Sequence, residues 1–346
     1  MANLLNIADD ENKQINEILF KLFQSTRLNI LLGSGASMPA ISIAGDLEVE
    51  VQALYDAGDD DGATNRLYDF LLSINQSTAN LVNKTPDANI AAVQNGYEGL
   101  FENIEKILNE RRTNILPKQV NIFTTNYDVF IEDALESFES VSLNDGFDRK
   151  PSLTGNFKFS TNSFSNAIFN SGTLYNYKVE FPSVNLYKLH GSMTWKQASN
   201  DIVYQIESRV PRPPGANVEQ LEEYVNSHAL VLPRKHKFSE TVLQQIYYDL
   251  LRLYANELDK ENTTLLVFGF SFADEHIIEI TKRALKNPTL KIVIFAYGDI
   301  ARDDFLEKFN NCHNVDVVVT GNGDPLDFSR FNEIVGAVLP RTIENA

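Results

Sequence analysis

Apolar residues gather in short runs that alternate with segments of helical spacing. The runs are rich in β-branched and aromatic residues, and each leads into a loop or a helical pattern: RLNILLG, QVNIFTTN, TLLVFGFSF, LKIVIFAYG and NVDVVVT. Near the N-terminus, DDENKQINEILFKLFQST places its apolar residues at helical spacing and predicts an amphipathic helix. Buried strands separated by helices are typical of an α/β fold with a parallel, doubly wound sheet.

Two stretches interrupt this alternation. Residues 43–118 mix acidic turns with the helical patterns RLYDFLLSI and YEGLFENIEKIL, which predicts a helical insertion between the first two strands. Residues 146–182 are rich in Asn, Ser, Phe and Tyr and contain few helix formers. We expect a small subregion of loops and short strands there, overhanging the sheet.

Composition narrows the class of protein. The 346 residues are 43% apolar, enough to bury a large core. A single cysteine, Cys312, excludes an intramolecular disulfide framework and a cysteine-based zinc cluster, and no apolar run is long enough to cross a bilayer. We therefore expect a cytoplasmic protein. The net charge of −17 opposes direct nucleic-acid binding, although PRKHK at residues 233–237 is a local basic patch.

A glycine-containing loop follows the first of the apolar runs. In GSGAS, Gly33 and Gly35 stand where backbone without side chains can approach a phosphate and a following helix can offer free N–H groups. Met38 replaces the third glycine of the dinucleotide fingerprint, and the Lys-Ser/Thr pair of nucleoside-triphosphate loops is missing. A tight glycine turn without a ligand is the alternative.

The second polar group follows QVNIF, where Thr124, Thr125, Asn126 and Asp128 leave the predicted strand. Asn126 precedes the helical pattern YDVFIEDALESF, so it is a candidate helix cap, with Asp128 favoured by the helix dipole. In a parallel sheet the same residues lie at the carboxyl edge, where ligands bind. From this stretch alone, the cap is the favoured interpretation.

Two more strand ends carry reactive side chains. NLYKLHGSMTW ends a predicted strand at His190, a side chain suited to accept a proton, and the next glycine leaves its ring accessible. The other four histidines are expected to be structural. LLVFGFSFADEHI breaks at Gly269 and delivers Ser271 and Asp274 into a turn before a helix. Metal binding there is not expected, because adjacent helical residues point in different directions.

Taken in order, GSGAS, TTNYD, LHGS and GFSF resemble the motifs of the sirtuin family. The similarity is greatest to the sirtuin-like NADase domains of prokaryotic anti-phage defence systems. The resemblance covers most of the chain and implies one catalytic domain over residues 1–346. Its implied fold is a Rossmann-like sheet with a smaller inserted module, binding NAD+ in the cleft between them.

The resemblance also implies a role for each motif. The implied catalytic residues are His190 as the base, Asn126 facing the nicotinamide ribose, and Asp128 facing the carboxamide. Gly269 and Ser271 would contact a phosphate or the adenosine ribose. The residues expected to line the rest of the cofactor site, chiefly around the phosphates, are Gly33, Ser34, Gly35, Ala36, Ser37 and Thr125.

Three departures from the sirtuin pattern bear on the activity. Thr125 stands where sirtuins have Gln, their Asp-Phe-Arg is absent after SMPAIS, and their four zinc cysteines are missing, so no metal is expected. These losses count against protein deacylation but leave NAD+ cleavage possible. The resemblance thus implies an NAD+ glycohydrolase with NAD+ as substrate. An NAD-dependent deacylase and a non-catalytic sensor of NAD or ADP-ribose are the alternatives.

The biological setting follows from the same resemblance. Such domains deplete cellular NAD+ when phage infection is sensed, which stops growth. The implied partners are further copies of the chain, in a homo-oligomer, and a HerA-type ATPase. A nucleic-acid enzyme acting with an ATPase is a weaker alternative, because the acidic chain would need a partner to supply the basic surface.

Overall fold

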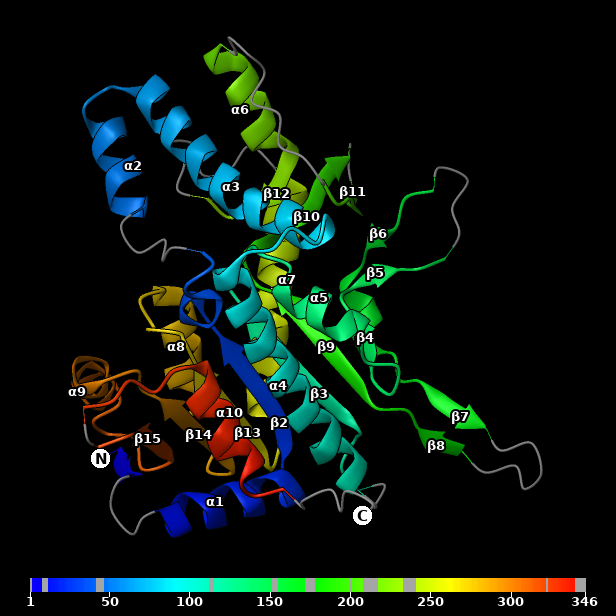
Figure 1. Ribbon diagram of the computed structural model, residues 1–346, viewed down its shortest axis with the longest axis vertical. Helices are drawn as coiled ribbons and strands as arrows, with labels where there is room; N and C mark the ends of the chain where they lie inside the picture. Colours follow the sequence, from blue (N-terminus) through cyan, green and yellow to red (C-terminus); the bar gives the residue numbers. More distant parts are fainter. Residues whose placement is uncertain are drawn as a thin grey trace.

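The computed structural model describes residues 2–7, 12–41, 47–111, 115–150, 155–171, 178–198, 201–207, 217–232, 241–321 and 323–339. Across these ranges, eight strands form one sheet in the order β1-β15-β14-β13-β2-β3-β9-β4 (Figure 1). Every neighbouring pair in this sheet is parallel. The mixed α/β fold with a parallel sheet, predicted from the apolar runs, is confirmed.

The strands of this sheet are β1 (Asn3–Asn6), β2 (Arg27–Leu32), β3 (Gln119–Thr124), β4 (Ser142–Asn144), β9 (Ser183–Lys188), β13 (Thr263–Phe268), β14 (Leu290–Phe295) and β15 (Val315–Val319). Each of the five predicted apolar runs contains one of them. The edge strands β1 and β4 were not predicted, because NLLN and SLN are too short to show a pattern.

Successive residues of a strand point to opposite sides of the sheet. Both sides are apolar here, and helices cover both of them. In β2, Ile30 and Leu32 face one core, and Leu31 faces the other. The first core is completed by α1 (Asn12–Ser25), α4 (Ala88–Glu110), α5 (Phe130–Glu136) and α10 (Phe328–Gly336). The second is completed by α7 (Thr241–Asp259), α8 (Glu275–Ala284) and α9 (Asp299–Lys308). The predicted N-terminal amphipathic helix is confirmed as α1.

The chain between β2 and β3 is largely helical. It holds the short 3-10 helix η1 (Ser34–Ser37), then α2 (Leu47–Asp56), α3 (Asp60–Val82) and α4. Helices α2 and α3 share a third core with α6 (Val218–Ser227), beyond one end of the main sheet (Figure 1). Helix α4 instead packs along the main sheet, so this segment spans two cores.

A second sheet, antiparallel and five-stranded in the described chain, adjoins the first in the order β12-β10-β11-β6-β5. Its strands are β5 (Phe147–Asp148), β6 (Lys158–Phe159), β10 (Gly191–Ala198), β11 (Asp201–Tyr204) and β12 (His228–Leu230). The range 146–182 contains β5, β6, the 3-10 helix η2 (Thr161–Ser165) and the separate pair β7 (Phe169–Ser171) and β8 (Lys178–Glu180). The sheet itself continues to Leu230.

Two further features of the sequence, its basic segment and the length of its apolar runs, can be compared with the structure. The basic segment PRKHK at residues 233–237 lies outside the described residues. Of the helices that are described, none is both long and apolar enough to cross a membrane.

Candidate functional site

The predicted site residues come from four neighbouring strands. In the order β13-β2-β3-β9, these strands run parallel, so their carboxyl ends share one edge of the sheet. Strand β3, which follows β2 in this sheet, lies on one side of β2, and the later strand β13 lies on its other side. Such a reversal of strand order is where open α/β sheets bind ligands.

The loops after β2 and β3 are joined by buried hydrogen bonds. Ser37 donates from Oγ to Oδ2 of Asp128 at 2.7 Å, and Nδ2 of Asn126 donates to Ser37 Oγ at 3.0 Å. Nδ2 of Asn126 also donates to the carbonyl oxygen of Gly33 at 2.9 Å. The Tyr97 hydroxyl from α4 lies 3.5 Å from Ser37 Oγ. The structure therefore brings Gly33, Ser37, Asn126 and Asp128 into one cluster.

These bonds fix the orientation of the Asn126 amide. The carbonyl oxygen of Gly33 can only accept, so the side-chain nitrogen must face it. No described residue donates to the side-chain oxygen of Asn126. Although the residue is only 7% exposed, its oxygen is therefore left for another partner at the sheet edge.

The expectation that Asn126 caps the following helix is wrong. Helix α5 begins at Phe130, and its N-cap residue is Val129, whose side chain makes no capping hydrogen bond. Earlier carbonyl groups are already used: Met193 N–H donates to that of Tyr127, and Lys188 Nζ to that of Asp128. These carbonyls are directed at β10 and β9, and the Asp133 N–H donates to the carbonyl of Val129, so the helix starts later than the pattern predicts.

The glycine loop is packed against the loop after β13. A Cβ on Gly33 would lie 2.4 Å from the carbonyl oxygen of Gly269, and one on Gly269 would lie 2.5 Å from the amide nitrogen of Ala36. Gly269 also has a positive φ of +65°. Close approach of two backbones thus requires glycine at these positions whether or not a ligand binds.

The expected helix after this loop is replaced by the short 3-10 turn of η1. The N–H groups of Gly33, Gly35 and Ala36 donate to the carbonyls of Phe268, Gly269 and Gly33, respectively. In this conformation those three amides are used within the protein. Ser34 is half-buried, so its position in the loop is more accessible than that of Ser37.

The remaining predicted residues lie on the rim. Thr125 is half-buried beside Asn126. Ser271 is exposed, and its carbonyl oxygen accepts a hydrogen bond from Lys308 Nζ at 2.8 Å. No described hydrogen bond joins Ser271 to the buried cluster.

His190 lies in the turn between β9 and β10, with its side chain 16% exposed. Its Nε2 is 3.0 Å from Oδ2 of Asp274, the N-cap residue of α8. The rings of Tyr127 and Tyr247 lie 6.4 and 6.1 Å from the imidazole, between ring centres. Gly191 is needed for the turn itself: its φ is +85°, and a Cβ would lie 2.1 Å from the Ala229 carbonyl oxygen.

Burial and neighbouring charges shift the pKa values of several groups around His190. Burial would raise the pKa of the Asp274 carboxyl, but its contact with His190 and the hydrogen bond from the Ile277 N–H hold it below its usual value. Burial, with Asp274 nearby, raises the pKa of Tyr247 to about 12 and that of Tyr127 further. Both phenols therefore stay neutral near pH 7, and the charge beside His190 is that of Asp274.

One buried lysine near the site was not predicted from the sequence. Lys188, the last residue of β9, is 2% exposed and donates from Nζ to the carbonyl oxygen of Asp128. The same Nζ lies 3.3 Å from Oε2 of Glu132 on α5. Burial raises the pKa of the Glu132 carboxyl, and Lys188 only partly offsets this. A lysine at the end of the predicted strand was the one signal in the sequence.

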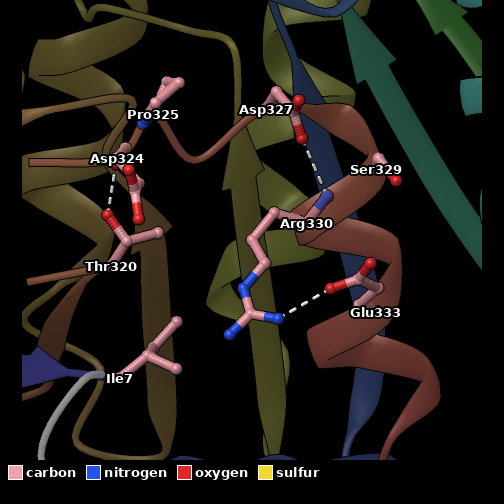
Figure 2. Close-up of a pocket in the computed structure, with 8 residues that line it drawn as sticks. All are labelled: Ile7, Thr320, Asp324, Pro325, Asp327, Ser329, Arg330 and Glu333. Atoms are coloured by element: carbon pink, nitrogen blue, oxygen red, sulfur yellow. Dashed lines mark hydrogen bonds and ion pairs between the residues drawn. The ribbon is translucent and has the colours of Figure 1, made fainter. Parts of the chain in front are cut away.

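A separate pocket lies at the far end of the same sheet edge. It is lined by Ile7, Thr320, Asp324, Pro325, Asp327, Ser329, Arg330 and Glu333 (Figure 2). Within it, Asp327 caps α10, and Arg330 is paired with Glu333 at 2.7 Å. None of the predicted site residues lines this pocket. Among the residues that the structure describes, no cluster of three or more His, Cys, Asp or Glu side chains is arranged to hold a metal.

Comparison with known proteins gives one family match. The family model described as "SIR2-like domain" matches residues 120–318, from β3 to β15. A solved structure described as a Sir2 homolog–NAD complex is 15% identical, with 93% of each chain covered and a TM-score of 0.47. A search of curated proteins found no match.

Proposed function

The chain belongs to the SIR2-like family, and we propose that it is an NAD+ glycohydrolase, cleaving NAD+ to nicotinamide and ADP-ribose. The proposed site is the carboxyl edge of β2, β3, β9 and β13. Asn126 and His190 are the proposed catalytic residues. Gly33, Ser34, Gly35, Ala36, Ser37, Thr125, Gly269 and Ser271 are proposed to line the NAD+ site.

One feature of the register supports this proposal most directly. Thr124 pairs with Lys188 at the last rung between β3 and β9, and the Leu189 N–H donates to the Thr124 carbonyl. Asn126 and His190 therefore each stand two residues beyond the same rung, on adjacent parallel strands. An amide and an imidazole at matching positions on adjacent strands, at the edge where such sheets bind ligands, suit chemistry on a bound sugar.

The reaction makes modest demands on the protein. Nicotinamide leaves as a neutral molecule from a cationic pyridinium, so no strong acid is required to protonate it. The bond to ribose breaks through an oxocarbenium-like transition state, as in glycoside hydrolysis. The protein has to hold the ribose, stabilise the developing sugar cation and position a water.

The described contacts suggest how these tasks are divided. The Asn126 oxygen, with its amide nitrogen held by Gly33 and Ser37, is proposed to orient a ribose hydroxyl or the attacking water. His190 would take the proton released from that group. The Asp128 carboxylate already accepts from Ser37 and from the Phe130 N–H at 3.3 Å. We therefore propose that Asp128 acts chiefly by fixing this loop; contact with the carboxamide would require it to exchange these partners.

The wider role rests on the motif resemblance described above. We extend the proposal to depletion of NAD+ in anti-phage defence, with self-assembly or a HerA-type ATPase as the activator. The deacylase alternative predicts that NAD+ disappears only when an acylated peptide is present. The sensor alternative predicts binding without release of nicotinamide.

The test is release of nicotinamide from NAD+, followed by chromatography, over a series of protein concentrations. It is run with the chain alone, with an acylated peptide, and with the products of neighbouring genes. We expect release without peptide and a loss of about 100-fold or more in Asn126→Ala. No release under any of these conditions would overturn the proposal.

Asn103→Ala is the matched control for the asparagine variant. Asn103 is also 7% exposed, and its Nδ2 donates to a backbone carbonyl, that of Asn332, at 3.0 Å. It lies on α4 and faces α10, and it makes no described hydrogen bond to the proposed site residues. If both variants lose activity to the same extent at equal folded fraction, the assignment of Asn126 is wrong.

A further inference from the structure

Asp274 uses its two carboxylate oxygens for two different purposes. Oδ1 accepts a hydrogen bond from the Ile277 N–H at 3.0 Å and so caps α8. Oδ2 lies 3.0 Å from Nε2 of His190. Because the cap fixes the carboxylate at the start of α8, it presents a negative charge at a defined point beside the imidazole.

The imidazole of His190 has little else to hold it. Its Nε2 is buried and lies near the Asp274 carboxylate without an aligned hydrogen bond to any described residue, so Asp274 acts on the ring mainly through the charge of its carboxylate. No described residue bonds to Nδ1. The groups facing the ring are Tyr127 from the loop after β3, Tyr247 from α7, and Asp274, whose own charge is also affected by His276.

We infer that Asp274 is a positioning residue for His190. The inference rests on the proposed function, in which His190 takes a proton from water or a ribose hydroxyl. A carboxylate beside Nε2 favours the tautomer with hydrogen on Nε2, which leaves the lone pair of Nδ1 to accept that proton. The proton ends on the imidazole, and Asp274 stays ionised beside the resulting cation.

Capping alone does not explain the placement of Asp274. Asp87 caps α4 through the N–H groups of Asn89 and Ile90, and Asp327 caps α10 through that of Arg330. Neither makes a described contact with a histidine. Asn is about as good an N-cap as Asp, so Asp274→Asn removes the charge and keeps the cap. Asp327→Asn is the same change at a cap without a histidine.

The first measurement is nitrogen NMR of the histidine rings, which shows directly which ring nitrogen carries hydrogen. We expect the Nε2–H form for His190 in the unmodified chain and in Asp327→Asn, and a mixture of both forms in Asp274→Asn. An Nδ1–H form in the unmodified chain, or no change in Asp274→Asn, would overturn the inference. This measurement does not depend on whether the chain cleaves NAD+.

The second measurement is the pH–rate profile of nicotinamide release. For Asp274→Asn we expect kcat to fall about 10-fold or more with KM within about twofold, and the acid limb to move to lower pH. Asp327→Asn should match the unmodified chain. An active chain with the same profile in Asp274→Asn would refute the role of Asp274 alone, whereas an inactive unmodified chain would refute the proposed function.

Discussion

Two histidines flank the same strand, and their surroundings differ sharply. His190 immediately precedes β10, and His228 pairs with Lys196 of β10 from the neighbouring strand β12. The Nε2 atom of His228 lies 2.5 Å from Lys196 Nζ, and Nδ1 lies 3.0 Å from the Tyr224 carbonyl oxygen. His228 is 1% exposed, so both of its nitrogens are committed inside the protein.

Donor and acceptor rules fix the state of His228. The Lys196 ammonium can only donate, so Nε2 must accept, and Nδ1 then carries the hydrogen that goes to the Tyr224 carbonyl. Lys196 also donates to Glu207 at 2.8 Å, and Tyr224 donates to the same carboxylate. This cluster ties β10 and β12 to α6 and is complete without a ligand.

The comparison separates a structural histidine from a candidate base by the partners of its ring. A ring whose two nitrogens are held by permanent partners has no lone pair to offer a substrate. His190 has a carboxylate on one side and no described partner on the other. Burial alone would not distinguish them clearly, since both rings are largely shielded.

Exchange of each histidine for alanine tests this comparison most strongly. His190→Ala should lower nicotinamide release by about 10²–10⁴-fold, the usual contribution of a general base, with little change in stability. His228→Ala should leave release per folded molecule nearly unchanged and lower the free energy of unfolding by about 1–3 kcal/mol. Enzyme assays and urea denaturation measure the two quantities. The reverse pattern would mean that His228 is the reactive residue.

The central strands and their polar ends could be predicted from local pattern, whereas the contacts between them could not. A run such as TTLLVF is buried on both faces and is recognisable by itself. The contact between His190 and Asp274 depends on how the carboxyl ends of β9 and β13 meet in space. No local pattern contains that information.

The late start of α5 has the same origin. The pattern from Tyr127 onward is helical, and local propensity favours a helix there. The carbonyls of Tyr127 and Asp128 are taken by groups on β10 and β9, which local sequence does not reveal. Tertiary bonds therefore overrode propensity, and the residue assigned as a cap became the link between two loops.

Removing the charge of Lys196 from the His228 cluster is expected to have an intermediate effect on stability. Lys196→Met should lower the free energy of unfolding by about 2 kcal/mol, because it leaves the Glu207 carboxylate without its cation. This is less than the ~3–5 kcal/mol of a fully buried pair, since the Glu207 side chain is 23% exposed. In Lys196→Met/Glu207→Gln the loss should be smaller than the sum of the single losses.

Urea denaturation of the four proteins gives that coupling energy. Nicotinamide release per folded molecule should stay near that of the unmodified chain in all of them. Additive losses would show that the pair is not coupled. A loss of activity without a loss of stability would show that the cluster serves the site.

The smallest expected effect is a change of stability with pH, which compares the His228 cluster with the pair formed by His190 and Asp274. Burial would raise the pKa of Glu207, but the hydrogen bond and charge of Lys196, with His228 and Tyr224, lower it overall. The pKa of Asp274 is also lowered, against burial, mainly by His190. A lowered folded pKa adds stability above the unfolded value, and this stability is lost as the pH falls through the folded one.

The stability lost on replacing Glu207 by Gln should therefore be constant above about pH 5 and shrink below about pH 4.3, the ordinary Glu value. For Asp274→Asn the difference should shrink only below about pH 3.9, the ordinary Asp value, and should stay under about 1 kcal/mol because the pair is partly solvated. Urea denaturation between about pH 3 and pH 6 measures both. A difference that grows as the pH falls would contradict these predictions, because it would mean that the Glu207 and Asp274 carboxylates are destabilising when ionised.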